Sequence, residues 1–177
     1  MSIYQTIVAI DPDIDKNGVA VIDRESRTCE VSCLPFPEVI DKVRGLYGLA
    51  TDKEEFSVEH RAALPFIVFV EAGWLNKGNW HITESRNGKY SPSAWAAAVG
   101  KSDGECSAVS KKLIEIFEYL GIPVQAVRPL RKCWNGKDRK ITHEELVREM
   151  AVYRIRFPYK RTNQETRDAA LIALVNF

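Results

Sequence analysis

Runs of apolar residues separated by polar turns predict several β-strands in the first part of the chain. Two predicted strands, at 5–11 and 66–71, contain unbroken apolar runs that stop at Asp11 and Glu71, as expected of strands buried on both faces. Residues 19–23 and 28–34 predict two more strands. Asn17-Gly18 favours a turn, so the strands on either side of it are expected to form a hairpin.

Amphipathic patterns and helix-terminal residues predict the remaining elements. In order, these are a helix at 39–47, a helix at 107–120, a strand at 122–127, a helix from 142 to about 153, and a helix beginning near 163 or 164. Gly121 is a C-cap, and Thr142 with Glu145 forms a capping box. Residues 48–64 are not assigned, and 72–105 are expected to form a long functional segment. The pattern predicts an α/β fold with one mixed sheet, in a single domain spanning residues 1–177.

Length and composition fit such a domain. A chain of 177 residues can bury its own core. No apolar run approaches the roughly 20 residues that cross a bilayer, and no charged-then-apolar leader opens the chain, so we expect a cytoplasmic protein without membrane contact. The cysteine spacing does not favour a zinc site, and reduced, partly buried thiols are expected.

Charge is divided unevenly along the chain. Residues 1–75 carry seven Lys and Arg against thirteen Asp and Glu, a net −6, whereas residues 128–161 carry eleven against four, a net +7. This division suits a polyanion held over an acidic site, although the basic residues could also simply solvate two helices. Within the basic stretch, the expected nucleic-acid-binding residues are Arg128, Arg131, Lys132, Lys137 and Arg139.

Four acids form the candidate catalytic site. Asp11 and Glu71 end buried strands, and Glu165 and Asp168 are spaced to share one face of the final helix. Acids that meet from separate segments repel one another unless a divalent metal lies between them. Four carboxylates are enough for two Mg²⁺ ions about 4 Å apart, which together act on a phosphodiester. Alternatively, the strand-end acids pair with a distant base, and the helical acids only satisfy the helix dipole.

The sequence also contains a partial calcium-loop pattern and several tryptophans outside the predicted strands. Asp13, Asp15 and Asn17-Gly18 match the first half of a calcium-binding loop, but Arg24 stands where that loop needs a glutamate. Trp74 and Trp80, which lie among Gly, Asn and Lys, are expected to stack on unpaired bases. Trp95 fits either base stacking or a place in the core.

Five pieces of the chain, in order, resemble a known family. They are 10–12 with 17–22, 68–71, 120–129, Lys140, and 165–170 with its Glu-x-x-Asp-Ala-Ala sequence. Together they resemble the RuvC-type Holliday-junction resolvases, a branch of the RNase H-like nucleases. The resemblance departs from that family at Glu165, where an Asp is usual, in the long 72–105 segment, and in the low net charge of +1.

The resemblance implies an RNase H-like fold with a five-stranded sheet flanked by helices. It implies Mg²⁺ or Mn²⁺ as cofactor, Lys140 as an active-site lysine, and a homodimer that cuts opposed strands of branched DNA in recombination or repair. The expected activity is therefore that of a metal-dependent, structure-selective endodeoxyribonuclease. The alternatives left open are a nuclease of the same fold acting on RNA–DNA hybrid, and a catalytically silent scaffold that binds nucleic acid or a partner protein.

Overall fold

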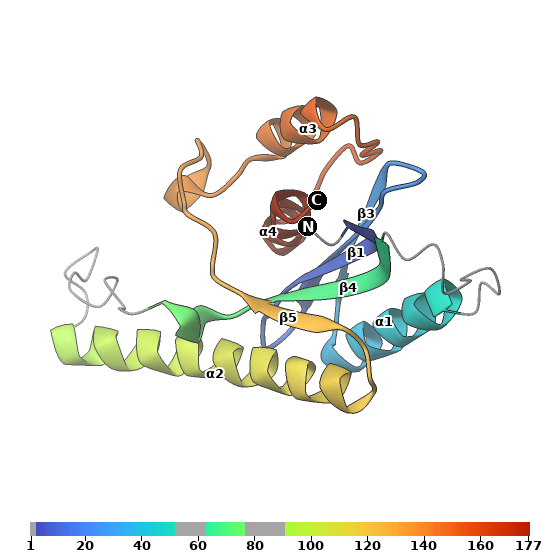
Figure 1. Cartoon of the computed structure of the whole chain (residues 1–177). Helices are drawn as coiled ribbons and strands as arrows, with labels where there is room; N and C mark the ends of the chain where they lie inside the picture. Colours follow the sequence, from blue (N-terminus) through green and yellow to red (C-terminus); the bar gives the residue numbers. More distant parts are fainter. Residues whose placement is uncertain (1–2, 52–62, 77–90) are drawn as a thin grey trace.

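The computed structural model describes residues 3–51, 63–76 and 91–177 (Figure 1). Over these residues, five strands form one mixed sheet in the order β3-β2-β1-β4-β5. The strands are β1 (Ile3–Asp11), β2 (Asn17–Asp23), β3 (Thr28–Leu34), β4 (Ala63–Glu71) and β5 (Val124–Val127). Strand β2 is antiparallel to β1 and β3, whereas β4 is parallel to β1 and β5 is parallel to β4.

The turn between β1 and β2 is placed differently from the prediction. Asn17 and Gly18 were expected in the turn but form the first two positions of β2. Asn17 is buried, its side-chain amide donates to the Leu34 carbonyl at 3.3 Å, and its Oδ1 accepts from the Asp13 amide at 3.2 Å. Asn17 therefore closes the turn from within the sheet, and the antiparallel pairing extends to Asp11 opposite Gly18.

Helices lie on both faces of the sheet. They are α1 (Phe36–Thr51), α2 (Pro92–Tyr119), α3 (His143–Val152) and α4 (Gln164–Val175), with short 3-10 turns η2 (Gly73–Leu75) and η4 (Lys137–Arg139). The predicted capping box of Thr142 and Glu145 is present at the start of α3, and Asn163 caps α4. Helix α1 is longer at both ends than the predicted 39–47.

Helix α2 is the main departure from the predicted elements. It begins at Pro92 rather than at residue 107, so much of the expected long segment is helical. The Ser91 side chain caps its first turn by accepting from the Ala94 amide at 3.3 Å, and Pro92 suits the first helical position. Helix-favouring alanines follow at 96–98. Gly100 and Gly104 argued against a helix there, but each costs only about 1 kcal/mol in a helix interior.

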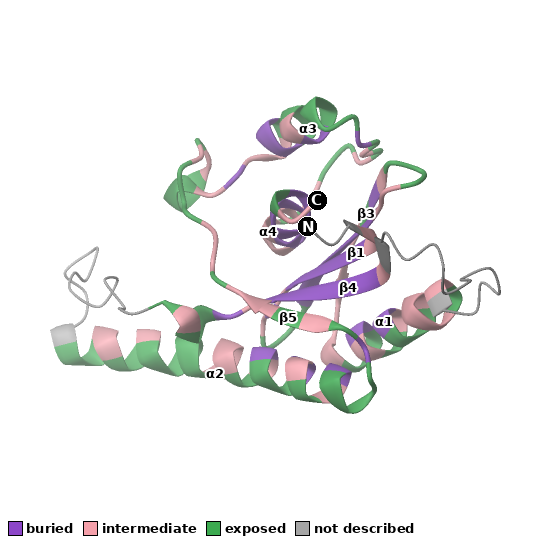
Figure 2. Cartoon of the chain, viewed as in Figure 1, coloured by how far each residue is buried: buried purple, intermediate pink, exposed green. Residues whose placement is uncertain are grey.

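The sheet divides the core into two parts. On one face, α1 and α2 pack against alternate strand residues such as Val8, Ile10 and Val68; on the other, α4 packs against Ile7, Ala9 and Phe69 (Figures 1 and 2). Helix α3 lies beyond α4 and contributes Leu146 and Met150 to this second core. The strands of the sheet centre are buried on both sides, as their unbroken apolar runs predicted (Figure 2).

The strand order, the antiparallel β2 and the helices on both faces define an RNase H-like α/β fold. The fold class predicted from the sequence is confirmed. Within the described part of the chain, every helix is too short or too polar to cross a membrane. The four cysteines all lie in described residues as free thiols, with Cys29 buried and Cys133 exposed.

Candidate functional site

Asp11 and Glu71 lie side by side at the ends of two parallel strands. The register pairs Ile10 with Val70, so the acids that follow them occupy neighbouring positions on β1 and β4. Side chains alternate between the two faces of a strand, and Ile7, Ala9 and Phe69 face α4. Asp11 lies two residues after Ala9 on β1, and Glu71 lies two residues after Phe69 on β4, so each acid is on the same strand face as that residue. Both acids therefore face the layer that contains α4.

Helix α4 begins directly above this end of the sheet. A Cβ built at Gly18 would lie 2.1 Å from the backbone oxygen of Glu165, so the backbone of α4 approaches β2 where a side chain has no room. Because Gly18 pairs with Asp11, this approach brings the first turn of α4 close to Asp11. Glu165 and Asp168 belong to the first and second turns of α4.

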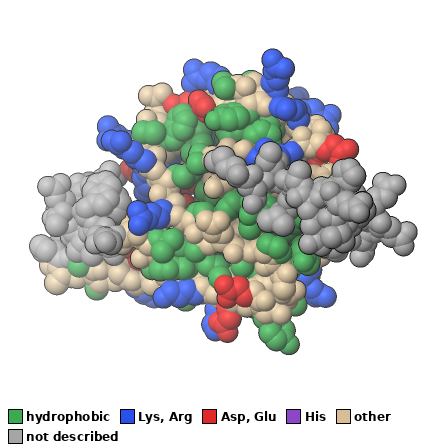
Figure 3. Space-filling model, viewed as in Figure 1, with side chains coloured by type: hydrophobic (Ala, Val, Ile, Leu, Met, Phe, Trp, Pro, Cys, Tyr) green, Lys and Arg blue, Asp and Glu red, His purple; other side chains and the backbone are tan. Residues whose placement is uncertain are grey.

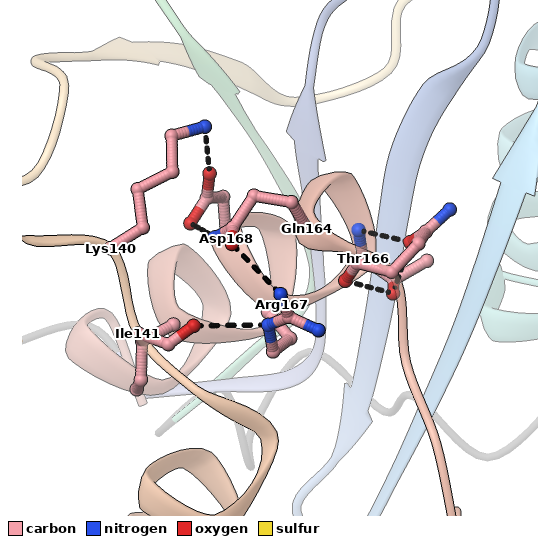
Figure 4. A network of polar contacts seen from close by, with 7 residues as sticks. Lys140, Ile141, Gln164, Thr166, Arg167 and Asp168 are labelled. Carbon is pink, nitrogen blue, oxygen red and sulfur yellow. Dashed lines mark hydrogen bonds and ion pairs between the residues drawn. The ribbon is translucent and has the colours of Figure 1, made fainter. Parts of the chain in front are cut away.

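Lys140 joins these acids from the segment before α3. Its Nζ donates to Asp168 Oδ2 at 3.0 Å, and the Gln164 side-chain amide donates to Asp168 Oδ1 at 2.7 Å (Figure 4). Both oxygens of Asp168 thus accept hydrogen bonds from this network. The structure brings together all five residues expected to be catalytic: Asp11, Glu71, Lys140, Glu165 and Asp168.

The charges of the acids act on one another. Burial raises the pKa of Asp11 well above its usual range, and the charges of Glu71, Asp168 and Glu165 raise it further, while Lys140 opposes them. Burial, with a contribution from Asp168, raises the pKa of Glu71 to about 6. Negative charge at this end of the sheet is therefore incompletely balanced by the protein.

Lys140 is held in its charged form by the same acids. Burial alone would lower its pKa, but the hydrogen bond and charge of Asp168, together with Asp11 and Glu165, raise the pKa above its ordinary value. Lys140 therefore remains a cation at any physiological pH. Lys140 balances part of the charge of the four acids. We call these four residues the acid cluster: Asp11, Glu71, Glu165 and Asp168.

The acid cluster fits the predicted divalent ions in chemistry and in charge. Carboxylate oxygens are the donors that Mg²⁺ and Mn²⁺ prefer, and the raised pKa of half-buried Asp11 marks a place where added positive charge would be stabilising. Across residues 3–51, 63–76 and 91–177, no three His, Cys, Asp or Glu side chains are already gathered as a ligand group. The charges of Glu71, Glu165 and Asp168 act on Asp11, and Lys140 forms an ion pair with Asp168.

The expected nucleic-acid-binding residues follow β5 on the segment that leads to α3. Arg128, Arg131, Lys132, Lys137 and Arg139 are all exposed. Figure 3 shows Lys and Arg side chains along the left flank of the molecule, where this segment lies in Figure 1. The charge of Lys132 also lowers the pKa of Glu71, so the basic segment reaches the edge of the acid cluster.

Of the tryptophans, Trp74 belongs to η2, three residues after Glu71, and is 36% exposed. The Lys111 ammonium lies 5.3 Å from the centre of its ring, a cation–π contact. Trp95 is half-buried within α2, a position that fits both base stacking and packing. Trp80 lies outside the described residues.

The buried side chain of Glu145 contacts the basic segment. From the sequence, Glu145 was predicted only as part of the capping box. Glu145 Oε1 accepts from the Asn135 side chain at 2.5 Å, and Oε2 accepts from the Thr142 amide at 2.9 Å. Gly136 donates from its amide to the Lys140 carbonyl at 3.0 Å. Asp138 and Arg139 have φ values of 56° and 60°, a conformation that non-glycine residues rarely adopt. The segment that ends at Lys140 is thus fixed by contacts around Glu145.

Sequence reasoning did not identify Gln164 and Arg167 as parts of the site. Arg167 donates through Nη2 to Gln164 Oε1 at 2.8 Å, and Gln164 in turn contacts Asp168 (Figure 4). The available signal was spacing, because Gln164 and Asp168 are four apart on one helix and so share a face.

Comparisons with known proteins gave matches among solved structures. Neither the protein-family models nor the curated proteins gave a match to this chain. Thermus thermophilus RuvC in complex with a Holliday junction substrate matches at 18% identity and a TM-score of 0.46, covering 96% of this chain and 91% of that one. A second Thermus thermophilus RuvC structure matches at 19% identity and a TM-score of 0.40, with the same coverage of both chains.

Proposed function

We propose that this chain is a metal-dependent, structure-selective endodeoxyribonuclease that cleaves Holliday junctions or similar branched DNA. The observation that carries the proposal is the meeting of acids from β1, β4 and α4 at one end of an RNase H-like sheet. Burial and, after it, the charges of the neighbouring acids raise the pKa of Asp11, so a bound cation at this place would be stabilising. A structural ion pair alone would not need four acids.

In this proposal, Asp11, Glu71, Glu165 and Asp168 hold two Mg²⁺ or Mn²⁺ ions. When bound, such ions supply an activated water and neutralise charge on a phosphodiester. Lys140 places a fixed ammonium beside the reacting phosphate and stabilises the charge that develops there. The half-buried position of the acids limits the access of bulk water, which strengthens these interactions.

The exposed basic residues bind the substrate backbone. Arg128, Arg131, Lys132, Lys137 and Arg139 contact phosphates on one side of the acid cluster. Trp74 stacks on an unpaired base at the branch point, where a base would compete with Lys111 for the ring. Two copies of the chain, related by two-fold symmetry, address two opposed strands of a four-way junction.

The test is cleavage of a labelled four-way junction by wild-type protein and by Asp11→Asn, each with and without Mg²⁺. We expect the wild type to cut only with Mg²⁺, and Asp11→Asn to lose cleavage while retaining junction binding, because the basic residues are unchanged. Asp15→Asn, a nearby exposed acid in the β1–β2 turn, is the matched control and should cut normally.

Each substrate in the assay separates one alternative. A linear duplex and an RNA–DNA hybrid are tested beside the junction. Preference for the hybrid would assign a different nuclease activity to the same site. Junction binding without cleavage under any metal condition would support the silent scaffold, and wild-type cleavage by Asp11→Asn would remove Asp11 from the metal site.

A further inference from the structure

Arg167 connects the first turn of α4 to the segment that carries Lys140. Its Nε donates to the Ile141 carbonyl at 3.0 Å, and its Nη1 donates to the Thr162 carbonyl at 2.5 Å. Its Nη2 donates to Gln164 Oε1 at 2.8 Å. Figure 4 shows the guanidinium between Ile141 on one side and the start of α4 on the other. A planar guanidinium with several fixed donors suits such a junction better than a flexible ammonium.

The contact with Arg167 fixes the orientation of the Gln164 amide. Guanidinium nitrogens only donate, so the oxygen of the Gln164 amide must face Arg167. Its nitrogen then faces Asp168 and donates to Oδ1 at 2.7 Å. One rotamer of Gln164 thus satisfies both neighbours, and it directs a donor at a member of the acid cluster.

The other contact of Arg167 acts on Lys140. Ile141 is buried and directly follows Lys140, so holding the Ile141 carbonyl fixes the backbone from which the lysine extends. Lys140 then reaches Asp168 Oδ2 at 3.0 Å. The contacts form a closed circuit from Arg167 through Gln164 to Asp168, and from Asp168 through Lys140 and Ile141 back to Arg167 (Figure 4).

We propose that Arg167 is a positioning residue that holds Lys140 and Asp168 in one geometry, acting on Asp168 through Gln164 and on Lys140 through the Ile141 carbonyl. The role of this geometry in cleavage rests on the proposed function. Residues that orient metal-binding and charged side chains typically change affinity or activity by about 10–100-fold when replaced.

The alternative is a purely structural role, in which Arg167 only anchors α4 to the rest of the protein. Helix α4 has other anchors, because Asn163 caps its first turn and residues 169–174 are buried in the core. Arg167, in contrast, is half-buried near the start of the helix. Its donors reach groups that adjoin or contact the Lys140–Asp168 pair, which is the arrangement a positioning role requires.

The first experiment compares wild-type protein with Arg167→Lys and with Arg44→Lys. Arg44 lies on α1, on the opposite face of the sheet, and serves as the matched control. Hydrogen exchange of the amides at 140–142 is measured on metal-free protein, and kcat and KM are measured on the junction. We expect Arg167→Lys to exchange faster at 140–142 and to lose about tenfold or more in kcat, with KM little changed. Arg44→Lys should match wild type in every readout.

A second experiment asks whether Arg167 acts through Gln164. Gln164→Met removes the amide and keeps the size of the side chain. If the two residues act in series on Asp168, the double variant Arg167→Lys/Gln164→Met should lose little more kcat than Arg167→Lys alone. Losses that multiply would show that Arg167 does not act on Asp168 through Gln164, against the proposal.

The outcomes separate this inference from the proposed function. Unchanged exchange at 140–142 in Arg167→Lys would overturn the positioning role. A fall in kcat accompanied by an equal loosening of the whole of α4 would assign Arg167 to helix anchoring and would also overturn it. If wild-type protein cleaves no nucleic acid, the proposed function fails, and the exchange comparison still decides whether Arg167 holds Lys140 in place.

Discussion

At Gly18, strand β2 leaves no room for a side chain beneath α4. A methyl group there would lie 2.1 Å from the Glu165 backbone oxygen and 2.4 Å from its carbonyl carbon. Backbone atoms cannot rotate away as a side chain can, so Gly18→Ala must push α4 off the sheet. We expect a loss of about 2–3 kcal/mol in the free energy of unfolding, measured with urea, and a large loss of cleavage.

The control for Gly18 is Gly45 on α1. Among the described atoms, nothing lies within 4 Å of a Cβ built at Gly45. Because alanine is the better helix former, Gly45→Ala should leave stability unchanged or raise it by up to about 1 kcal/mol. Equal effects of the two substitutions would mean that α4 adjusts freely at Gly18.

Glu71 should make the metal-free protein less stable at neutral pH than at acid pH. In the unfolded chain its pKa is near 4.5, and in the folded protein it is about 6, so between these values the folded state holds an extra proton. Stability attributable to Glu71 therefore falls as pH rises through this window and is lowest above it. Glu71→Gln, which does not titrate, should raise stability at pH 7.5 by about 1–2 kcal/mol.

The advantage of Glu71→Gln should disappear near about pH 3, where Glu71 is protonated in both the folded and the unfolded state. Unfolding by urea in the presence of a chelator, at both pH values, measures the difference. Glu30→Gln, at an exposed position on β3, is the control. A variant that is less stable than wild type at pH 7.5 would mean that Glu71 has a structural partner.

Much of the candidate site was predictable at the residue scale, because an acid at the end of an apolar run is visible in the sequence. Asp11 and Glu71 were identified in this way, and the spacing of Glu165 and Asp168 indicated a shared helix face. Gln164, Arg167 and Gly18 were not identified as parts of the site. Their roles depend on contacts between α4 and distant segments, which no local pattern encodes.

Among the elements, the segment from β5 to α3 should govern the salt dependence of nucleic-acid binding. Each phosphate contact releases counterions, so the logarithm of affinity falls linearly with the logarithm of salt concentration. Replacing Arg131, Lys132 and Lys137 together by Ala should reduce that slope by up to about 3. Fluorescence anisotropy of a labelled junction across a salt series measures it.

A triple variant of exposed basic residues elsewhere is the control for charge alone. Arg44, Lys101 and Lys112 lie on α1 and α2 and form exposed ion pairs with acids on the same helices. Replacing these three by Ala changes the net charge equally and should leave the slope nearly intact. If the two triple variants give similar slopes, the basic residues between β5 and α3 only solvate the surface and make no special contact with phosphates.

Prediction succeeded for elements with clear ends and failed where the ends were ambiguous. The capping box at Thr142 and the apolar strands were read correctly because each depends on a few neighbouring residues. The first half of α2 was missed because Gly100 and Gly104 are weak helix formers and much of its surface is exposed. Such a helix has no strong apolar stripe, and its continuity comes from the packed second half and the Ser91 cap.

For the whole molecule, we expect a two-fold dimer in which α2 contributes to the contact. Figure 1 shows the N-terminal end of α2 extending beyond the sheet. A junction presents two symmetric phosphates, and one site per copy would match them. Light scattering at micromolar concentration should give twice the mass of one 20.1 kDa chain. A mass near that of one chain, with cleavage intact, would rule out the dimer as the working form.

The position of α4 has a consequence for synthesis of the protein. Two acids of the cluster come from the sheet, at residues 11 and 71, and the other two come from α4, at residues 165 and 168, much later in the sequence. During translation, the first two acids emerge and can fold into the sheet long before α4 exists, so the set is complete only after residues 164–175 leave the ribosome and dock. The acid cluster is therefore incomplete until α4 has docked on the sheet, so the proposed cleavage cannot begin before that point. Cleavage assays on stalled nascent chains that end before residue 164 should accordingly show none.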